Sequence, residues 1–323
     1  MSFIAAAASI LVMGAQNVPP KTDFPNIESL VIRPSATDKA IKVADENHTL
    51  YWPKGAKVRE ELVVFIPGTN GNGTGAVTYC RAIASFGHRV LNLTYPSDIP
   101  AAIVRNQPDR NAFLNFRLEI IEGGDKSDAI EVDRTNSIEN RLIKALDYLG
   151  RTQPKDNWGR YLTSAGQINW EKVIVAGHSQ GAGHAALIGT RHKVARVVMT
   201  GGPRDYDRSA DAPAAWYGNS VTPVSRFFTF NHQQDQQGCS FEELLKNVRK
   251  MGLDQVGAPV DIDKVASPYQ GSHILTTNYP VPQINSLRAH VSVIHDTLTP
   301  RDKAGKLLFL PVWEYMFTSP LES

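Results

Sequence analysis

The sequence has few cysteines, little net charge and no long apolar segment, and each of these shortages narrows what the chain can be. Only Cys80 and Cys239 occur, so one intramolecular disulfide or two free thiols are the possibilities. The formal net charge of +2 gives no electrostatic reason to expect binding to nucleic acid or to an anionic membrane. The 323 residues contain no internal repeat, low-complexity tract or block of like charge, so partners must be inferred from a site.

Common metal and nucleotide motifs are missing as well. There is no His-Glu-x-x-His sequence and no pair of Cys-x-x-Cys sequences, so the usual ligand spacings for zinc do not occur. No Gly-x-Gly-x-x-Gly follows a predicted strand in the position that a dinucleotide needs. We therefore expect no metal ion and no cofactor.

The N-terminus contains an apolar run of thirteen residues, Phe3–Ala15. This run is too short to span a bilayer comfortably, so we expect no stable membrane span. Its length suits the hydrophobic part of a signal peptide, although no Lys or Arg precedes it, and a buried N-terminal helix or strand is the alternative. We expect residues 1–22 to be a signal segment with a linker, and the protein to be secreted or periplasmic.

Apolar runs that suit buried strands alternate with helical patterns along most of the chain, which favours an α/β fold. Eight strands are predicted, at Ile27–Arg33, His48–Trp52, Leu62–Ile66, Arg89–Thr94, Lys172–Ala176, Ala195–Thr200, Arg226–Phe230 and Ser272–Thr277. The clearest helices are Gly75–Phe86, Thr135–Gly150 and Phe241–Met251. We expect an eight-stranded, mostly parallel sheet flanked by helices, within a single domain over residues 23–323.

The segment at about 96–134 interrupts this alternation. It contains several prolines and the pair Gly123-Gly124, with a possible helix near Asn111–Ile121, and it is too long for an ordinary connection. We interpret it as an insertion over the sheet edge or over the top of a site. It either shapes a substrate pocket or is purely structural.

The most informative stretch is Trp170–Gly189. A β-branched strand is followed by Gly177-His178-Ser179-Gln180-Gly181 and then by a helix of small residues. A strand, a Gly-x-Ser-x-Gly turn and a helix are typical of a nucleophile elbow, in which the serine occupies a strained turn and flanking side chains would collide. This pattern predicts Ser179 as a nucleophile and the backbone N–H of Gln180 as a donor to an oxyanion.

A serine hydroxyl is a weak nucleophile near neutral pH, so it needs a histidine to take its proton and a carboxylate to orient that histidine. Asp235 follows the strand Arg226–Phe230 by five residues and is one candidate for the acid. Asp205, five residues beyond Ala195–Thr200, is the alternative.

Three histidines in the last part of the chain are candidates for the base. His290 and His295 lie beyond the last predicted strand, and their positions alone leave both open. His273 falls at the start of a strand, where a core or edge role is expected. The loop after Leu62–Ile66 is rich in glycine, which lets backbone approach a substrate closely, and Thr69 and Asn70 are its candidate N–H donors.

From roughly Ile27 to Phe317, the chain resembles the α/β hydrolases, which carry their triad in the order Ser, Asp or Glu, His. It is most similar to a group of signal-bearing serine hydrolases that share GHSQGAGHAAL, a helix like SIENRLIKALDYL and a tail like DTLTP…FLPVWEYM. In that group, a His-x-Ser-Val sequence followed by Asp and then Thr-Pro implies His290 as the base.

The resemblance implies an α/β-hydrolase fold and an esterase-like or lipase-like serine hydrolase. The implied triad is Ser179, Asp235 and His290, with Gln180 and Thr69 as the oxyanion donors. The substrate would be a small-molecule or polymer ester. A catalytically inactive α/β-hydrolase domain used for binding, or an acyltransferase with the same machinery, is the alternative.

Overall fold

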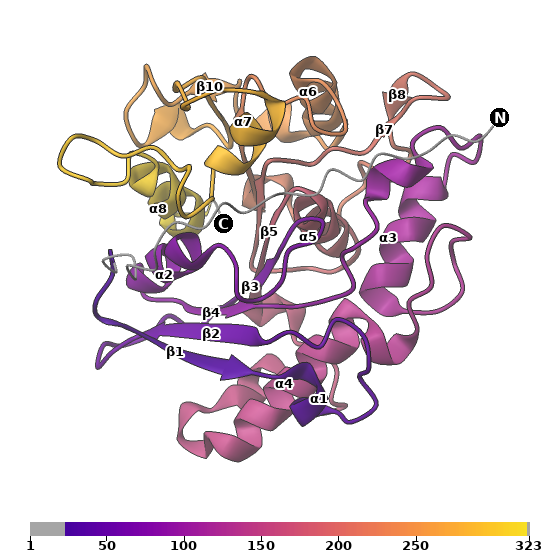
Figure 1. Ribbon diagram of the computed structural model, residues 1–323, viewed down its shortest axis with the longest axis vertical. Coiled ribbons are helices and arrows are strands. Elements are labelled where there is room, and N and C mark those ends of the chain that lie inside the picture. The colour runs from indigo at the N-terminus through magenta and orange to yellow at the C-terminus, as the bar shows by residue number, and fades with distance from the viewer. Residues whose placement is uncertain (1–22, 322–323) are drawn as a thin grey trace.

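Nine strands form one mixed sheet in the computed structural model, which describes residues 23–321 (Figure 1). Its order is β1-β2-β4-β3-β5-β6-β9-β11-β10. The signal segment and linker expected at residues 1–22 lie outside the described residues. The strands are β1 Ile27–Ile32, β2 His48–Pro53, β3 Leu62–Ile66, β4 Arg89–Asn92, β5 Val173–His178, β6 Arg196–Thr200, β9 Phe227–His232, β10 Val260–Asp261 and β11 Ile274–Thr277.

The sheet is mostly parallel, as the sequence predicts. The pairs β1–β2 and β2–β4 are antiparallel, whereas every pair from β4 across to β10 is parallel. All six residues of β5 are buried, because helices cover both faces of the sheet at its centre. A mixed α/β architecture with a large, mostly parallel sheet is therefore confirmed.

The predicted count of eight strands is wrong. The additional strand, β10, consists of Val260 and Asp261 and pairs with β11 at the edge of the sheet. Two residues cannot show an alternating or continuous apolar pattern, so periodicity does not detect such a strand. A separate two-stranded ribbon of β7 (Tyr206–Asp207) and β8 (Ala212–Pro213) was missed for the same reason.

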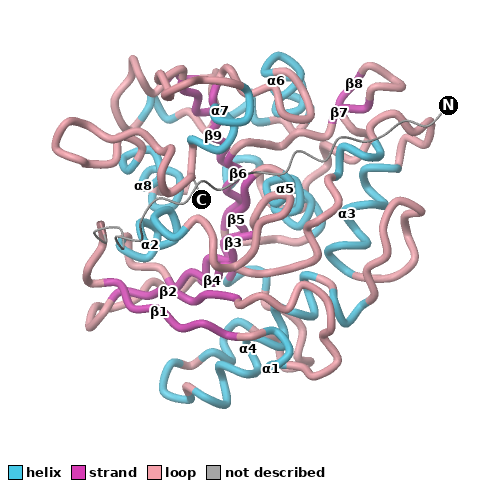
Figure 2. The backbone as a smooth tube through the Cα atoms, viewed as in Figure 1, coloured by secondary structure: helices cyan, strands magenta, loops and turns pink. Residues whose placement is uncertain are grey.

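Helices cover the two faces of the sheet in two groups. Figure 2 shows the strands along the middle of the molecule, with α2 and α8 on one side and α3 and α5 on the other. Successive residues of β3 alternate between the two cores: Val64 belongs to the core that contains residues of α3, α4, α5 and α6, and Phe65 to the core that contains residues of α2 and α8. The helices are α1 Pro34–Thr37, α2 Val77–Ser85, α3 Ala112–Glu122, α4 Ile138–Thr152, α5 Gln180–Arg191, α6 Phe241–Lys250, α7 Ser286–Ser292 and α8 Leu310–Thr318.

Local sequence explains where the clearest helices begin. Ser137 caps α4 by accepting a hydrogen bond from the Asn140 N–H at 3.3 Å. Ser240 and Glu243 form a reciprocal capping box at the start of α6. The helices predicted from apolar spacing, including the one inside the insertion at 96–134, are confirmed within a few residues.

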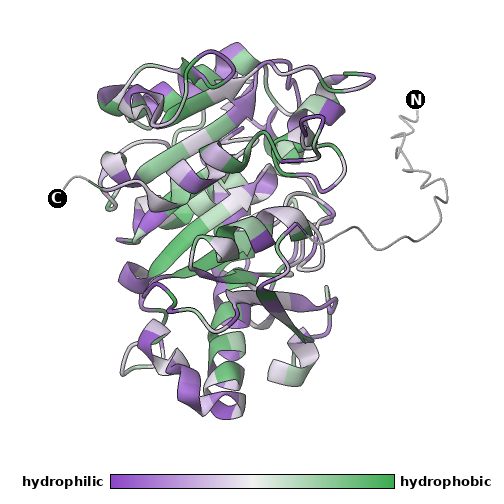
Figure 3. Ribbon diagram, turned by 90° about the vertical axis from the view of Figure 1, so that its left-hand side faces the viewer, coloured by the Kyte–Doolittle hydropathy of each residue, from purple (hydrophilic) through white to green (hydrophobic). Residues whose placement is uncertain are grey.

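The two cysteines are free thiols on opposite faces of the sheet. Cys80, on α2, belongs to the core that contains α8, and Cys239 belongs to the core that contains α5. Both thiols are buried, and the sheet lies between them. In Figure 3 the strands at the centre of the molecule are mostly green, consistent with a core on both faces.

Several histidines are buried and held neutral by the fold. Burial lowers the pKa of His48 and His178 to about 3, and that of His88 and of the half-buried His273 to about 4. Burial, with a contribution from the Arg117 charge, places the pKa of His184 well below its ordinary range. Unfolding returns each of them to a pKa near 6.5.

These shifts predict that the free energy of unfolding falls as the pH drops from about 7.5 to 5.5. Below about pH 6.5 these histidines bind protons in the unfolded chain but not in the folded chain. This difference lowers the free energy of unfolding by about 1 kcal/mol per buried histidine over that range. Urea unfolding at the two pH values measures this effect. Replacing His88 with Leu should reduce the difference, and a pH-independent unfolding free energy would contradict the account.

Candidate functional site

Ser179 lies in the turn between β5 and α5, at the carboxyl edge of the sheet. Its φ of 57° and ψ of −118° are unfavourable for a residue with a side chain. A Cβ atom on Gly177 would lie 2.2 Å from the Gly181 carbonyl oxygen, and one on Gly181 would lie 1.9 Å from the Ile66 oxygen. Both glycines are therefore required by backbone contacts, as the elbow pattern predicts.

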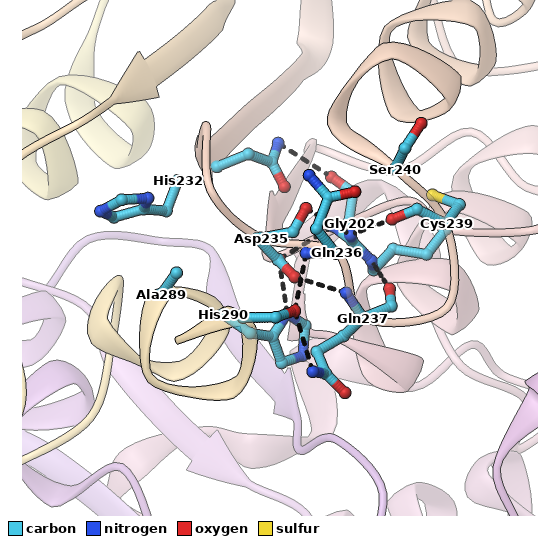
Figure 4. A network of polar contacts seen from close by, with 12 residues as sticks. Gly202, His232, Asp235, Gln236, Gln237, Cys239, Ser240, Ala289 and His290 are labelled. Carbon is cyan, nitrogen blue, oxygen red and sulfur yellow. Dashed lines mark hydrogen bonds and ion pairs between the residues drawn. The ribbon is translucent and has the colours of Figure 1, made fainter. Parts of the chain in front are cut away.

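His290 and Asp235 form a buried pair beside this turn. The Nδ1 atom of His290 lies 2.6 Å from Oδ2 of Asp235, and the two side chains are 5% and 1% exposed (Figure 4). His290 is on α7, and Asp235 is in the loop after β9. The carboxylate accepts a hydrogen bond from the Nδ1–H group of His290. The other ring nitrogen, Nε2, is therefore the one left for a reacting group.

The Asp235 carboxylate is held in its ionised form. Burial alone would raise its pKa, but the positive charge and hydrogen bond of His290, together with the Arg204 charge, outweigh burial and lower the pKa. Arg204 donates to the same oxygen, Oδ2, at 2.9 Å. The Gln237 N–H donates to the other oxygen, Oδ1, at 2.9 Å.

Ser179 and His290 line one cavity of about 650 Å³. The insertion at 96–134 forms part of its wall through Ala101, Phe113 and Arg117. Elsewhere the wall is largely apolar, with Phe65, Ala76, Leu287, Val291 and Ile294. The insertion therefore shapes the pocket, which was one of the two interpretations of this segment.

The loop after β3 approaches Ser179 closely. A Cβ atom on Gly68 would lie 2.9 Å from the Cβ atom of Ser179, so only glycine fits there. The Asn70 N–H donates to the Ser97 carbonyl at 2.9 Å and is not available to a ligand. Among the residues that the structure describes, the backbone N–H groups of Thr69 and Gln180 have no acceptor, so these two can point donors at an oxyanion.

The Gln180 side chain connects this loop to the insertion. Its Oε1 atom accepts from the Ala101 N–H at 2.7 Å and from the Thr69 hydroxyl at 3.2 Å. One side chain thus fixes the relative positions of the elbow, the loop after β3 and the inserted segment. The identity of the residue after Ser179 matters for this reason as well as for its N–H.

Asp205, the alternative acid, forms no hydrogen bond with His290 among the described residues. Its carboxylate binds the Arg117 guanidinium through both oxygens, with Nη2–Oδ1 at 2.6 Å, and accepts from the Trp216 indole at 3.0 Å. Both members of the ion pair are 2% exposed. The structure pairs Asp235, and not Asp205, with a histidine.

The other histidines have different surroundings. His295 is exposed and lines the cavity, and its Nδ1 atom lies 3.2 Å from the Thr297 hydroxyl. The neighbouring Asp296 accepts from the Val77 and Thr78 N–H groups at the start of α2. His273 is half-buried and stacks on Phe228 with ring centroids 3.9 Å apart, in agreement with the core or edge role expected of it.

Two arginines in this region were not predicted. Arg117 donates to the Gln180 carbonyl at 2.9 Å, and its guanidinium lies directly over Gly183 of α5. Arg204 clamps the loop that carries Asp235. The available signal for Arg117 was a charged residue inside the apolar face Phe113–Ile120, and for Arg204 it was its position shortly after a buried strand.

In residues 23–321 no three His, Cys, Asp or Glu side chains gather in an arrangement that could hold a metal ion. In the same part of the chain, no helix combines the length and apolarity needed to cross a bilayer. Comparisons of the sequence with protein-family models and with curated proteins gave no match. The site must therefore be interpreted from its own geometry.

Gly183→Ala should destabilise the protein by about 1–3 kcal/mol, because it overfills a packed contact. The new Cβ atom would lie 2.1 Å from Arg117 Cζ and would displace the guanidinium from the Gln180 carbonyl. Gly150→Ala on α4 is the matched control, since nothing lies within 4 Å of its Cβ position. It should stabilise the helix by roughly 0.5–1 kcal/mol. Equal effects in urea unfolding would contradict this assignment.

Asp205→Asn should lower the free energy of unfolding by about 3–5 kcal/mol, because it leaves the buried Arg117 charge without its carboxylate. The control is Asp254→Asn, which breaks an exposed pair with Arg249 and should change stability little. Thermal and urea unfolding of both variants measure the difference. A small effect for Asp205→Asn would show that the buried pair contributes little to stability.

Proposed function

We propose that the chain is a serine hydrolase with an α/β-hydrolase fold, which cleaves a carboxylic ester through a Ser-His-Asp triad. The observation that carries the proposal is the 2.6 Å contact between His290 Nδ1 and Asp235 Oδ2, beside a cavity that Ser179 also lines. Support for the fold is the chain order, with Ser179 after β5, Asp235 after β9 and His290 after β11.

Acylation begins when Ser179 Oγ attacks the carbonyl carbon of the ester. His290 Nε2 takes the hydroxyl proton, and the ionised Asp235 stabilises the imidazolium that results. The N–H groups of Thr69 and Gln180 hold the oxyanion of the tetrahedral intermediate. When that intermediate collapses, His290 gives its proton to the leaving alcohol and the acyl group remains on Ser179.

Deacylation repeats these steps with water. His290 removes a proton from the water that attacks the acyl carbonyl, and the second intermediate releases the carboxylic acid and the free serine. The His178 ring lies beside the His290 ring, with centroids 4.7 Å apart and the ring planes tilted by 42°, and it stays neutral because burial lowers its pKa to about 3. A neutral neighbour adds no charge repulsion when the imidazolium forms.

The apolar wall of the cavity favours an ester with a hydrocarbon part on its acyl or alcohol side. Both a small molecule and one end of a polymer fit this description. Export of the protein stays a prediction from residues 3–15.

The proposal is tested by labelling with a fluorophosphonate, which reacts with activated serines, followed by peptide mapping. Wild type and His295→Ala should be labelled at Ser179, whereas Ser179→Ala should not. His290→Ala should react roughly 100-fold to 10,000-fold more slowly, the usual loss when a general base is removed. His295→Ala is the matched control, because it removes another histidine that lines the cavity, one that forms no hydrogen bond with Asp235 among the described residues.

Absence of labelling in folded wild type would reject the hydrolase and favour an inactive domain used for binding. If labelling occurs, adding an alcohol to an ester assay separates the hydrolase from the acyltransferase. The hydrolase should release mainly free acid, and a predominance of transferred ester would favour the alternative.

A further inference from the structure

Arg204 is almost buried, with 8% of its side chain exposed, although it carries a permanent charge. It lies in the loop after β6 and donates to three carbonyl groups of the loop after β9. The acceptors are the carbonyl oxygens of Asp235 at 3.2 Å, Cys239 at 2.7 Å and Gln237. A single guanidinium therefore holds the loop that presents Asp235.

The same guanidinium also binds the carboxylate oxygen that His290 uses. Asp235 Oδ2 accepts from Arg204 Nη1 at 2.9 Å and from His290 Nδ1 at 2.6 Å. A triad needs only the second of these contacts. The first adds a positive charge within hydrogen-bond distance of the group that stabilises the imidazolium.

Other charges near His290 do not duplicate this effect. His178 on β5 is neutral, and Arg117 is neutralised by its contact with Asp205. Arg105 and His295 line the cavity, and neither hydrogen-bonds to Asp235 within the described residues. Arg204 is thus the cation that opposes the Asp235 carboxylate directly.

We propose that Arg204 is a positioning residue that both fixes the Asp235 loop and weakens the hold of the carboxylate on the His290 imidazolium. The inference rests on the proposed function. Because the imidazolium is stabilised less, His290 stays a free base to lower pH, and activity extends further into the acidic range.

The test is the pH profile of kcat/KM for ester hydrolysis. In Arg204→Gln the acidic limb should move to higher pH by roughly half to one unit, since the opposing charge is gone. Arg204→Lys keeps the charge, so the acidic limb of its kcat/KM profile should stay near that of wild type. Because lysine cannot reach three carbonyls together, the free energy of unfolding of this variant should fall. Arg208→Gln is the control, because Arg208 pairs with Glu243 on α6 and forms no hydrogen bond with Asp235 among the described residues, so its acidic limb should not move.

If wild type and Arg204→Gln have the same acidic limb, the proposal is overturned. Arg204 would then only hold the loop in place. If Arg204→Gln does not fold, Arg204→Lys decides, because it keeps the charge and loses the clamp: an acidic limb that moves by about half a unit or more, or an unchanged free energy of unfolding, overturns the proposal. These failures differ from failure of the proposed function, in which folded wild type would not react with the fluorophosphonate at all.

Discussion

The close approach of the backbone around Ser179 is the constraint on which the rest of the site depends. The turn between β5 and α5 fits under the end of β3 only because Gly177 and Gly181 have no side chains. The packing pins Ser179 at a φ of 57°, where an unsupported residue would relax. It also brings the loop after β3 to the serine, and it leaves the first N–H of α5 without an acceptor inside the protein.

Two buried arginine–aspartate pairs hold the segments around this turn, and each has a different task. Arg117 and Asp205 join the insertion to the loop after β6, and Arg117 continues to the Gln180 carbonyl. Arg204 and Asp235 join the loops after β6 and β9, and Asp235 continues to His290. Burying charges is costly, and both pairs offset that cost through several hydrogen bonds in fixed geometry. The result is a set of segments around the cavity that are joined to one another by buried hydrogen bonds.

The sequence predicts the elements that depend on local pattern. Apolar spacing predicts the main strands and α4 with its buried stripe. The glycine pattern singles out Ser179 and Gln180. Asp235 and His290 were accessible only as preferred candidates, since the contact between them joins residues far apart in the chain. Asn70 could be set aside as a donor only once its bond to Ser97 was visible. Arg117 and Arg204 were missed because their roles come from long-range packing, and β10 because it is two residues long.

The central claim is that Ser179 forms a covalent acyl intermediate whose formation depends on Asp235 and His290. Rapid mixing with an activated ester, acid quenching and mass spectrometry of the peptides measures this directly. The account predicts a burst of alcohol release comparable to the enzyme concentration, the mass of the acyl group on Ser179, and near-complete loss of both in Asp235→Asn but not in Asp254→Asn. Ester cleavage without an acyl group on Ser179, or with an undiminished burst in a folded Asp235→Asn variant, would contradict it.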